Sequence, residues 1–195
     1  MGVPAKQDLP ILELEDQAAW ERWLAANHDS SKGVRLKFAK KGSGGVTVTH
    51  AQALETALCY GWIDGQAGRF DDRYWLVRFT PRGPRSRWSQ INRENAERLI
   101  AEGRMKPAGL AKVKAAQEDG RWEAAYPAQS QATVPDDFQK ALDENPQAKA
   151  FFETLTGSTR YAFLFRLHNV KREETRQRRI ANYIKLLNDQ KTLFD

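Results

Sequence analysis

The spacing of hydrophobic residues changes along this chain, and that change limits the folds open to it. Every second residue is apolar from 34 to 38 and again from 75 to 79, which is the spacing of strands with one buried face. Beyond residue 135 the apolar residues recur every three or four positions, as they do on one face of a helix. The sequence therefore predicts an α+β fold, with a small mixed α/β N-terminal part containing an antiparallel sheet, followed by a C-terminal helical bundle.

The N-terminal part carries recognisable helix starts. Thr49 and Gln52 form a capping-box pair, Ser89 is a favourable N-cap, and Pro107 suits the first turn of a helix. Paired strands are indicated on either side of a turn at residues 71–72. We therefore expect helices at 16–27, 49–61, 89–102 and 107–120, and strands at 34–38, 66–70 and 74–80.

A stretch rich in Ala, Gln, Ser and Thr divides the chain. It covers residues 126–135, and this composition is typical of a connection between folded parts. We expect an α+β domain at 1–125 and a helical domain at 136–195. Helices are predicted in the second domain at 136–144, 146–155, 158–169 and 172–189. The third of these is apolar on nearly all sides, which predicts that it is the central helix of the bundle.

The composition limits the cellular setting. Cys59 is the one cysteine, so no intramolecular disulfide can form and a reducing compartment, the cytoplasm, is expected. No stretch approaches the roughly 18 to 20 apolar residues of a membrane span, and residues 1–7 lack the apolar run of a signal peptide, so no membrane insertion is expected. The formal net charge of +6 is compatible with an anionic partner, including nucleic acid.

No complete catalytic, metal or cofactor motif occurs in the sequence. His28, His50 and His168 are far apart, and none has metal-ligand spacing with Cys59 or a carboxylate. His50 and Cys59 fall on roughly opposite faces of one predicted helix, so they cannot form a catalytic pair. We therefore expect no metal and no cofactor, and Asp64, between glycines and arginines, is only a weak candidate for a general base.

Arginine and tryptophan residues gather between residues 61 and 89, and this cluster suggests a function. Arginine presents a planar fork of donors that matches phosphate or carboxylate, and tryptophan presents a flat ring for stacking. The helix that follows Ser89 adds free backbone amides at its start. The predicted ligand-binding residues are Trp62, Asp64, Arg78, Arg82, Arg85 and Trp88, joined by Arg176 and Arg179 from the last helix.

Several interpretations of this cluster stay open. The leading hypothesis is a non-enzymatic binding protein for a phosphate metabolite, a nucleotide or nucleic acid. A second is an enzyme of unknown class that acts on an anionic small molecule, with Asp64 as its base. A third is a module that docks on another protein in stress resistance. A structural alternative is that Trp62 and Trp88 are core residues and that the arginines pair with nearby aspartates.

Five segments of the chain carry a family resemblance: Leu36 to Lys41, Cys59 to Gly65, Arg78 to Arg82, Glu102 to Met105, and Lys171 to Ile180. Together they resemble the YdeI/OmpD-associated, or bacteriocin-protection, family, also called OmdA-like. The resemblance covers nearly the whole chain, and it departs from the usual tail phrase at Val170 and Glu173, where Ala and Pro are common.

The resemblance implies a bacterial protein linked to protection from bacteriocins or cationic peptides and to association with an outer-membrane porin. Some relatives join this type of tail to a frataxin-like iron-chaperone domain. Iron delivery of that kind needs an acidic surface, whereas the acidic pair at residues 71–72 of this chain lies among many arginines.

Overall fold

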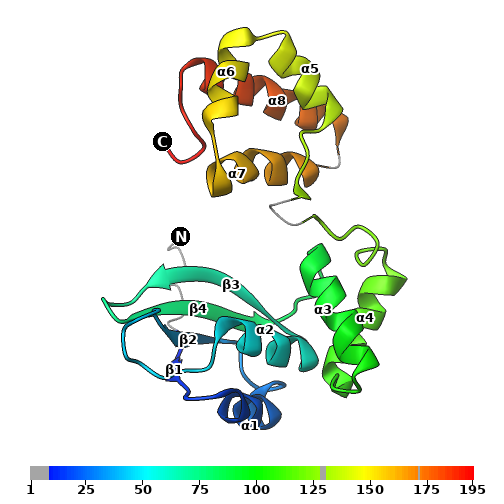
Figure 1. Cartoon of the computed structure of the whole chain (residues 1–195). Coiled ribbons are helices and arrows are strands. Elements are labelled where there is room, and N and C mark those ends of the chain that lie inside the picture. The colour runs from blue at the N-terminus through cyan, green and yellow to red at the C-terminus, as the bar shows by residue number, and fades with distance from the viewer. Residues whose placement is uncertain (1–8, 128–130, 171) are drawn as a thin grey trace, which may run out of the picture. The chain divides into compact units, whose positions relative to one another are not determined.

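The computed structural model describes residues 9–127, 131–170 and 172–195 of the chain. The chain divides into two compact units, Met1–Ala125 and Tyr126–Asp195, and each is described by itself (Figure 1). Residues 128–130 of the predicted linker, Lys171 of the family resemblance and the start of the chain at residues 1–7 lie outside the described residues. No helix in the described part is long and apolar enough to cross a membrane.

Within residues 9–127, the N-terminal unit forms a four-stranded mixed sheet with the order β1-β2-β4-β3 (Figure 1). Strand β2 pairs antiparallel with β4, and β4 pairs antiparallel with β3, as predicted. Strand β1 was missed and pairs parallel with β2, so the sheet is mixed and not purely antiparallel. At three residues, β1 is too short for alternation to reveal it. The strands are β1 (Ile11–Glu13), β2 (Val34–Ala39), β3 (Trp62–Arg69) and β4 (Tyr74–Pro81).

Strand β3 begins at Trp62, four residues before the predicted start at Gln66. Its pairing with β4 shifts between Asp64 and Ala67. Such an irregularity, like a β-bulge, places extra residues on one strand and breaks the alternation of its side chains. Gly65, which lies in the shifted stretch, also has no side chain to contribute to the pattern. The prediction of the strand start was wrong for these two reasons.

The helices predicted for the N-terminal unit are confirmed within one or two residues at their starts. The Asp16 side chain accepts a hydrogen bond from the Ala19 amide at 2.7 Å, and Thr49 and Gln52 form the predicted capping box. Helices α1 and α2 pack against one face of the sheet, and α3 and α4 pack against α2. Their bounds are α1 (Gln17–Asn27), α2 (His50–Cys59), α3 (Gln90–Ala101) and α4 (Pro107–Glu118).

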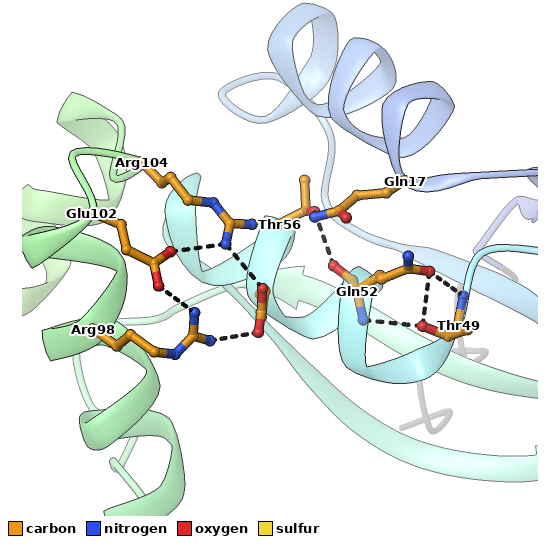
Figure 2. Close-up of polar contacts among 8 residues, drawn as sticks. Gln17, Thr49, Gln52, Thr56, Arg98, Glu102 and Arg104 are labelled. Atoms are coloured by element: carbon orange, nitrogen blue, oxygen red, sulfur yellow. Dashed lines mark hydrogen bonds and ion pairs between the residues drawn. The ribbon is translucent and has the colours of Figure 1, made fainter.

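Alternating charges join α2 to α3 and the turn that follows α3 (Figure 2). Glu55 of α2 pairs with Arg98 at 2.5 Å and with Arg104 at 3.2 Å. Glu102 pairs with the same two guanidinium groups at 2.9 and 3.0 Å. Hydrogen bonds from Arg98 and Arg104 lower the pKa of Glu102. The segment from Glu102 to Met105, noted above for its family resemblance, is therefore part of the contact between helices.

A second chain of polar contacts joins α1 to α2 (Figure 2). The Gln17 amide donates to the Thr56 hydroxyl at 3.0 Å, and that hydroxyl donates to the Gln52 carbonyl at 2.9 Å. Thr56 is buried, so both bonds satisfy a hydroxyl that would otherwise be costly inside the core. This chain of bonds fixes the register between α1 and α2.

The C-terminal unit is helical, as predicted, with a core of its own around Phe138, Phe152 and Phe163. Its central helix is the last one, α8, which packs against α5, α6 and α7. The prediction that α7 is central was wrong because its apolar side is partly covered by the chain just before the bundle: the Tyr126 ring contacts the Phe165 ring at 5.0 Å. The bounds are α5 (Asp136–Asp143), α6 (Pro146–Thr154), α7 (Gly157–His168) and α8 (Glu173–Asn188).

Candidate functional site

Trp62 and Trp88, two predicted ligand-binding residues, lie in the core of the N-terminal unit. Their exposed fractions are 1% and 2%. The Trp62 indole donates to the His28 carbonyl at 3.0 Å and its ring contacts the Trp20 ring. Trp88 packs edge-on against Trp122, with the ring centroids 4.7 Å apart. Neither ring offers a free face on which a base could stack, which agrees with the structural alternative for these two residues.

Arg82 is also buried, with an exposed fraction of 2%. Its guanidinium carbon lies 3.7 Å from the centroid of the Trp88 ring, a cation–π contact. One guanidinium nitrogen donates to the Arg87 carbonyl at 2.9 Å. These contacts hold the loop that leads into α3. Arg85 lies on the same loop and is exposed.

Arg176 and Arg179 belong to the C-terminal unit and bond to neighbouring helices there. Arg176 donates to both carboxylate oxygens of Asp137 on α5 and, at 2.7 Å, to the Leu167 carbonyl on α7. Arg179 donates to the Arg166 carbonyl at 2.8 Å. Arg176 therefore connects three helices of its own unit.

The pair of Arg176 and Asp137 predicts a pH-dependent stability. Hydrogen bonds from Arg176 lower the pKa of Asp137 from its ordinary 3.8, so this contribution is present above pH 4 and is lost as the pH falls through the folded-state pKa. Asp137 is partly exposed, and solvent screening reduces the effect of replacing it by Asn to about 1 kcal/mol at pH 7. Urea unfolding at pH 7 and pH 3 measures this loss, which should shrink at pH 3. An equal loss at both values would contradict the ionic origin.

Arg78, a predicted residue of the N-terminal unit, lines an open cavity. The cavity has a volume of about 440 Å³ and lies on the face of the sheet opposite the hydrophobic core. Arg35 of β2 stands directly across from Arg78 of β4 in the strand register. The residues that line this basic sheet cavity are Leu9, Lys32, Arg35, Gln66, Ala67, Gly68, Arg69, Leu76 and Arg78.

Three of the four cations that line the basic sheet cavity form no ion pair with the described part of the protein. Lys32, Arg35 and Arg78 form no ion pair among those residues, whereas Arg69 pairs with Asp72 and Lys37 pairs with Glu13 at 2.7 Å. Like charges directly opposite each other on neighbouring strands destabilise a sheet. Among the described residues, no carboxylate compensates the two like charges of Arg35 and Arg78.

Aromatic rings accompany the cations on this face of the sheet. The Lys37 ammonium lies 4.1 Å from the centroid of the Tyr74 ring and 4.8 Å from that of Phe70. Phe70 is exposed. Phe70, unlike the buried tryptophans, therefore has part of its ring in contact with solvent, and the Lys37 ammonium lies over that ring.

Asp64 lies on the opposite face of the sheet from Arg78, because it pairs in register with the buried Phe79. Its carboxylate is 3.2 Å from the Nε2 atom of His50, and both side chains are partly exposed. The His50 ring packs against Phe38 and Trp75. The sequence separated these two residues by a helix and gave no sign of their pairing. A histidine next to a carboxylate is a combination that general acid–base chemistry uses.

Metal-ligating and nucleophilic groups are sparse in the part of the chain that the structure describes. No group of three or more His, Cys, Asp or Glu side chains among the described residues could hold a metal ion. Cys59 is buried, and burial raises the pKa of its thiol, which keeps the thiol protonated and weakly reactive.

Two protein families match this chain. Residues 12–112, just over half of the chain, match the family described as Domain of unknown function (DUF8412). Residues 131–190 match the family described as Bacteriocin-protection, YdeI or OmpD-Associated, which confirms the resemblance seen in the sequence for that region. Comparisons with curated proteins and with solved structures gave no match. The chain therefore belongs to the family of this domain of unknown function and carries a C-terminal YdeI/OmpD-associated region.

Proposed function

We propose that this protein is a non-enzymatic binding protein whose N-terminal unit holds a phosphate-bearing ligand in the basic sheet cavity. The observation that carries the proposal is the cross-strand position of Arg35 and Arg78, which have no ion-pair partner among the described residues. Two guanidinium groups directly across a sheet can bind one phosphate from both sides.

The size and surroundings of the cavity support a small phosphorylated molecule. Its volume of about 440 Å³ falls in the usual range for small-molecule sites. Lys32 adds a third positive charge, and Gln66 adds neutral hydrogen-bonding groups. Phe70 does not line the cavity, but its ring is exposed on the same unit, so a nucleotide or single-stranded nucleic acid that extends beyond the cavity has a ring on which a base can stack.

The replacement of both Arg35 and Arg78 by Gln tests this proposal. Affinity for nucleoside triphosphates, pyrophosphate or a short oligonucleotide should fall more than tenfold, because both charge-assisted contacts are lost. The melting temperature of the free protein should stay the same or rise, because a repulsive pair is removed. Thermal shift with this panel of ligands measures both quantities, since binding to the native state raises the transition.

Two matched variants separate this site from a general charge effect. Arg22→Gln removes an exposed charge from α1. Arg85→Gln removes an exposed charge from the loop between β4 and α3, where the sequence predicted a ligand-binding residue. Both should retain binding, and binding should weaken with added salt. If the Arg35 and Arg78 variant binds every ligand as tightly as the unmodified protein, the basic sheet cavity is not the site.

A second candidate function, an enzyme acting on an anionic small molecule, is favoured by the pairing of His50 with Asp64. In that case the Asp64 carboxylate orients His50 or stabilises its protonated form, and His50 transfers a proton in the reaction. The Asp64→Asn variant should then lose turnover while it retains ligand affinity. Full turnover in that variant would remove the role.

The cellular setting is a further part of the proposal. The single, buried Cys59 suits a reducing compartment such as the bacterial cytoplasm. The name of the family that residues 131–190 match suggests a role in bacteriocin protection, for which a protein partner is the alternative to a small anion. A partner that stays bound in a pull-down after salt and nuclease treatment would favour the protein partner over the anion.

A further inference from the structure

A second basic cavity lies in the C-terminal unit, on the surface of α7 and α8. Its volume is about 650 Å³, larger than a single phosphate group needs and within the range of small-molecule and cofactor sites. The residues that line this helical basic cavity are Arg166, Thr175, Arg178, Arg179, Asn182, Tyr183 and Leu186.

Four of the residues that line this cavity form one stripe along α8. Thr175, Arg179, Asn182 and Leu186 follow one another at intervals of three or four residues, so they share a face of the helix. The core of the unit takes a different stripe, which includes Ile180 and Leu187. The residues of the stripe that faces the cavity are not among the buried core residues of the unit.

The three arginines of the cavity have no carboxylate partner among the described residues. Arg166, Arg178 and Arg179 differ in this from Arg176, which pairs with Asp137 on the core side of the same helix. The hydrogen bond from Arg179 to the Arg166 carbonyl fixes the position of one guanidinium group. The cavity thus carries three positive charges, one of them held in place.

Tyr183 adds a buried hydroxyl to this cluster. Its side chain is only 4% exposed. The Arg166 side chain lies close enough to the hydroxyl to act on its pKa as a hydrogen-bond partner, but no hydrogen bond of regular geometry joins the hydroxyl to a described residue. Burial raises the pKa of Tyr183, while the charges of Arg179 and Arg166 act in the opposite direction. A buried hydroxyl without a complete hydrogen bond is unusual in folded proteins. An oxygen of an anionic ligand would complete it once a side chain that lines the cavity moves aside, because the hydroxyl itself is buried.

We propose that the helical basic cavity is a second site, separate from the basic sheet cavity, for a molecule with more than one phosphate group. Arg166 and Arg178 supply charge and donors, Arg179 supplies a fixed guanidinium group, and the Tyr183 hydroxyl donates to a phosphate oxygen. Guanidinium groups and a neutral hydroxyl are the donors that phosphate sites commonly combine. The site stands whether or not the N-terminal unit binds an anion.

Calorimetric titration of the full chain with inorganic tripolyphosphate tests the proposal, in a background in which Arg35 and Arg78 are both replaced by Gln. Binding should persist in this background. Replacement of Arg166 and Arg178 by Gln should weaken it more than tenfold. Tyr183→Phe, which changes no charge, should weaken it about five- to tenfold, because one hydrogen bond is lost, and should leave the melting temperature the same or higher.

Lys140→Ala is the matched control, since it removes an exposed charge from α5 outside the cavity and should leave the affinity unchanged. Absence of tripolyphosphate binding in the background, or equal binding after loss of Arg166 and Arg178, overturns the proposal. A short oligonucleotide in a parallel titration distinguishes the source of the phosphates: competition with tripolyphosphate assigns the cavity to a nucleic acid backbone, and a preference for the small polyphosphate assigns it to a metabolite.

Discussion

Replacement of Trp62 by Ala is expected to lower the free energy of unfolding of the N-terminal unit by about 3 to 5 kcal/mol, the usual loss for a buried aromatic side chain. The Trp62 ring contacts Trp20 and Trp23 in the core, and its indole donates to the His28 carbonyl. The variant removes this volume and leaves the carbonyl without its donor. Urea unfolding followed by tryptophan fluorescence measures the loss.

Trp62→Phe is the informative control. It keeps most of the buried apolar area but removes the indole donor, so its loss should be smaller than that of Trp62→Ala. The Phe variant should also bind anions as the unmodified protein does, because the ring at this position has no open face. A stable Trp62→Ala variant that no longer binds would instead restore the stacking role suggested by the sequence.

Replacement of Gly109 by Ala in α4 is expected to destabilise the protein by about 2 to 3 kcal/mol, the upper part of the range for overpacked sites. A Cβ atom at this position would lie 2.3 Å from the Cys59 carbonyl oxygen at the end of α2. That oxygen belongs to the backbone, so only movement of a whole helix relieves the contact. Thermal and urea unfolding of the variant measure the effect.

The sign of this result is the test, because Ala normally stabilises a helix relative to Gly. Ala111→Gly, at an exposed position of the same helix, should cost about 1 kcal/mol through helix propensity alone. Gly109→Ala and Ala111→Gly should therefore both destabilise the protein, although the first adds a methyl group and the second removes one. A rise in stability for Gly109→Ala would mean that α2 and α4 do not approach each other this closely.

Local signals predicted much of the secondary structure. The capping box at Thr49 and Gln52 and the start of α4 at Pro107 depend on residues that are neighbours in sequence, and local chemistry is enough to identify them. Strand β1 was not predictable in this way, because its three residues are held by pairing with β2. The central position of α8 was not predicted either. Part of the apolar surface of α7 is covered by the Tyr126 ring and not by other helices of the bundle, and the sequence pattern of α7 does not show this.

The candidate site, like the secondary structure, could be predicted from the sequence only in part. The alternation of residues in β2 and β4 placed Arg35 and Arg78 on the solvent side of their strands, but only the pairing register puts them directly across from each other. The pairing of His50 with Asp64 likewise depends on the docking of α2 on β3. Arg82 has the sequence context of a binding residue, yet its contact with Trp88 buries it. Composition alone cannot separate a buried arginine from an exposed one.

The register shift in β3 has a consequence for how copies of this protein behave in solution. Strand β3 lies at an edge of the sheet, and an edge strand exposes unpaired backbone groups that can template pairing with another chain. A bulge bends and twists such a strand, so a second flat strand cannot align along its full length. The irregularity between Asp64 and Ala67 thus protects the sheet from growing by addition of further copies.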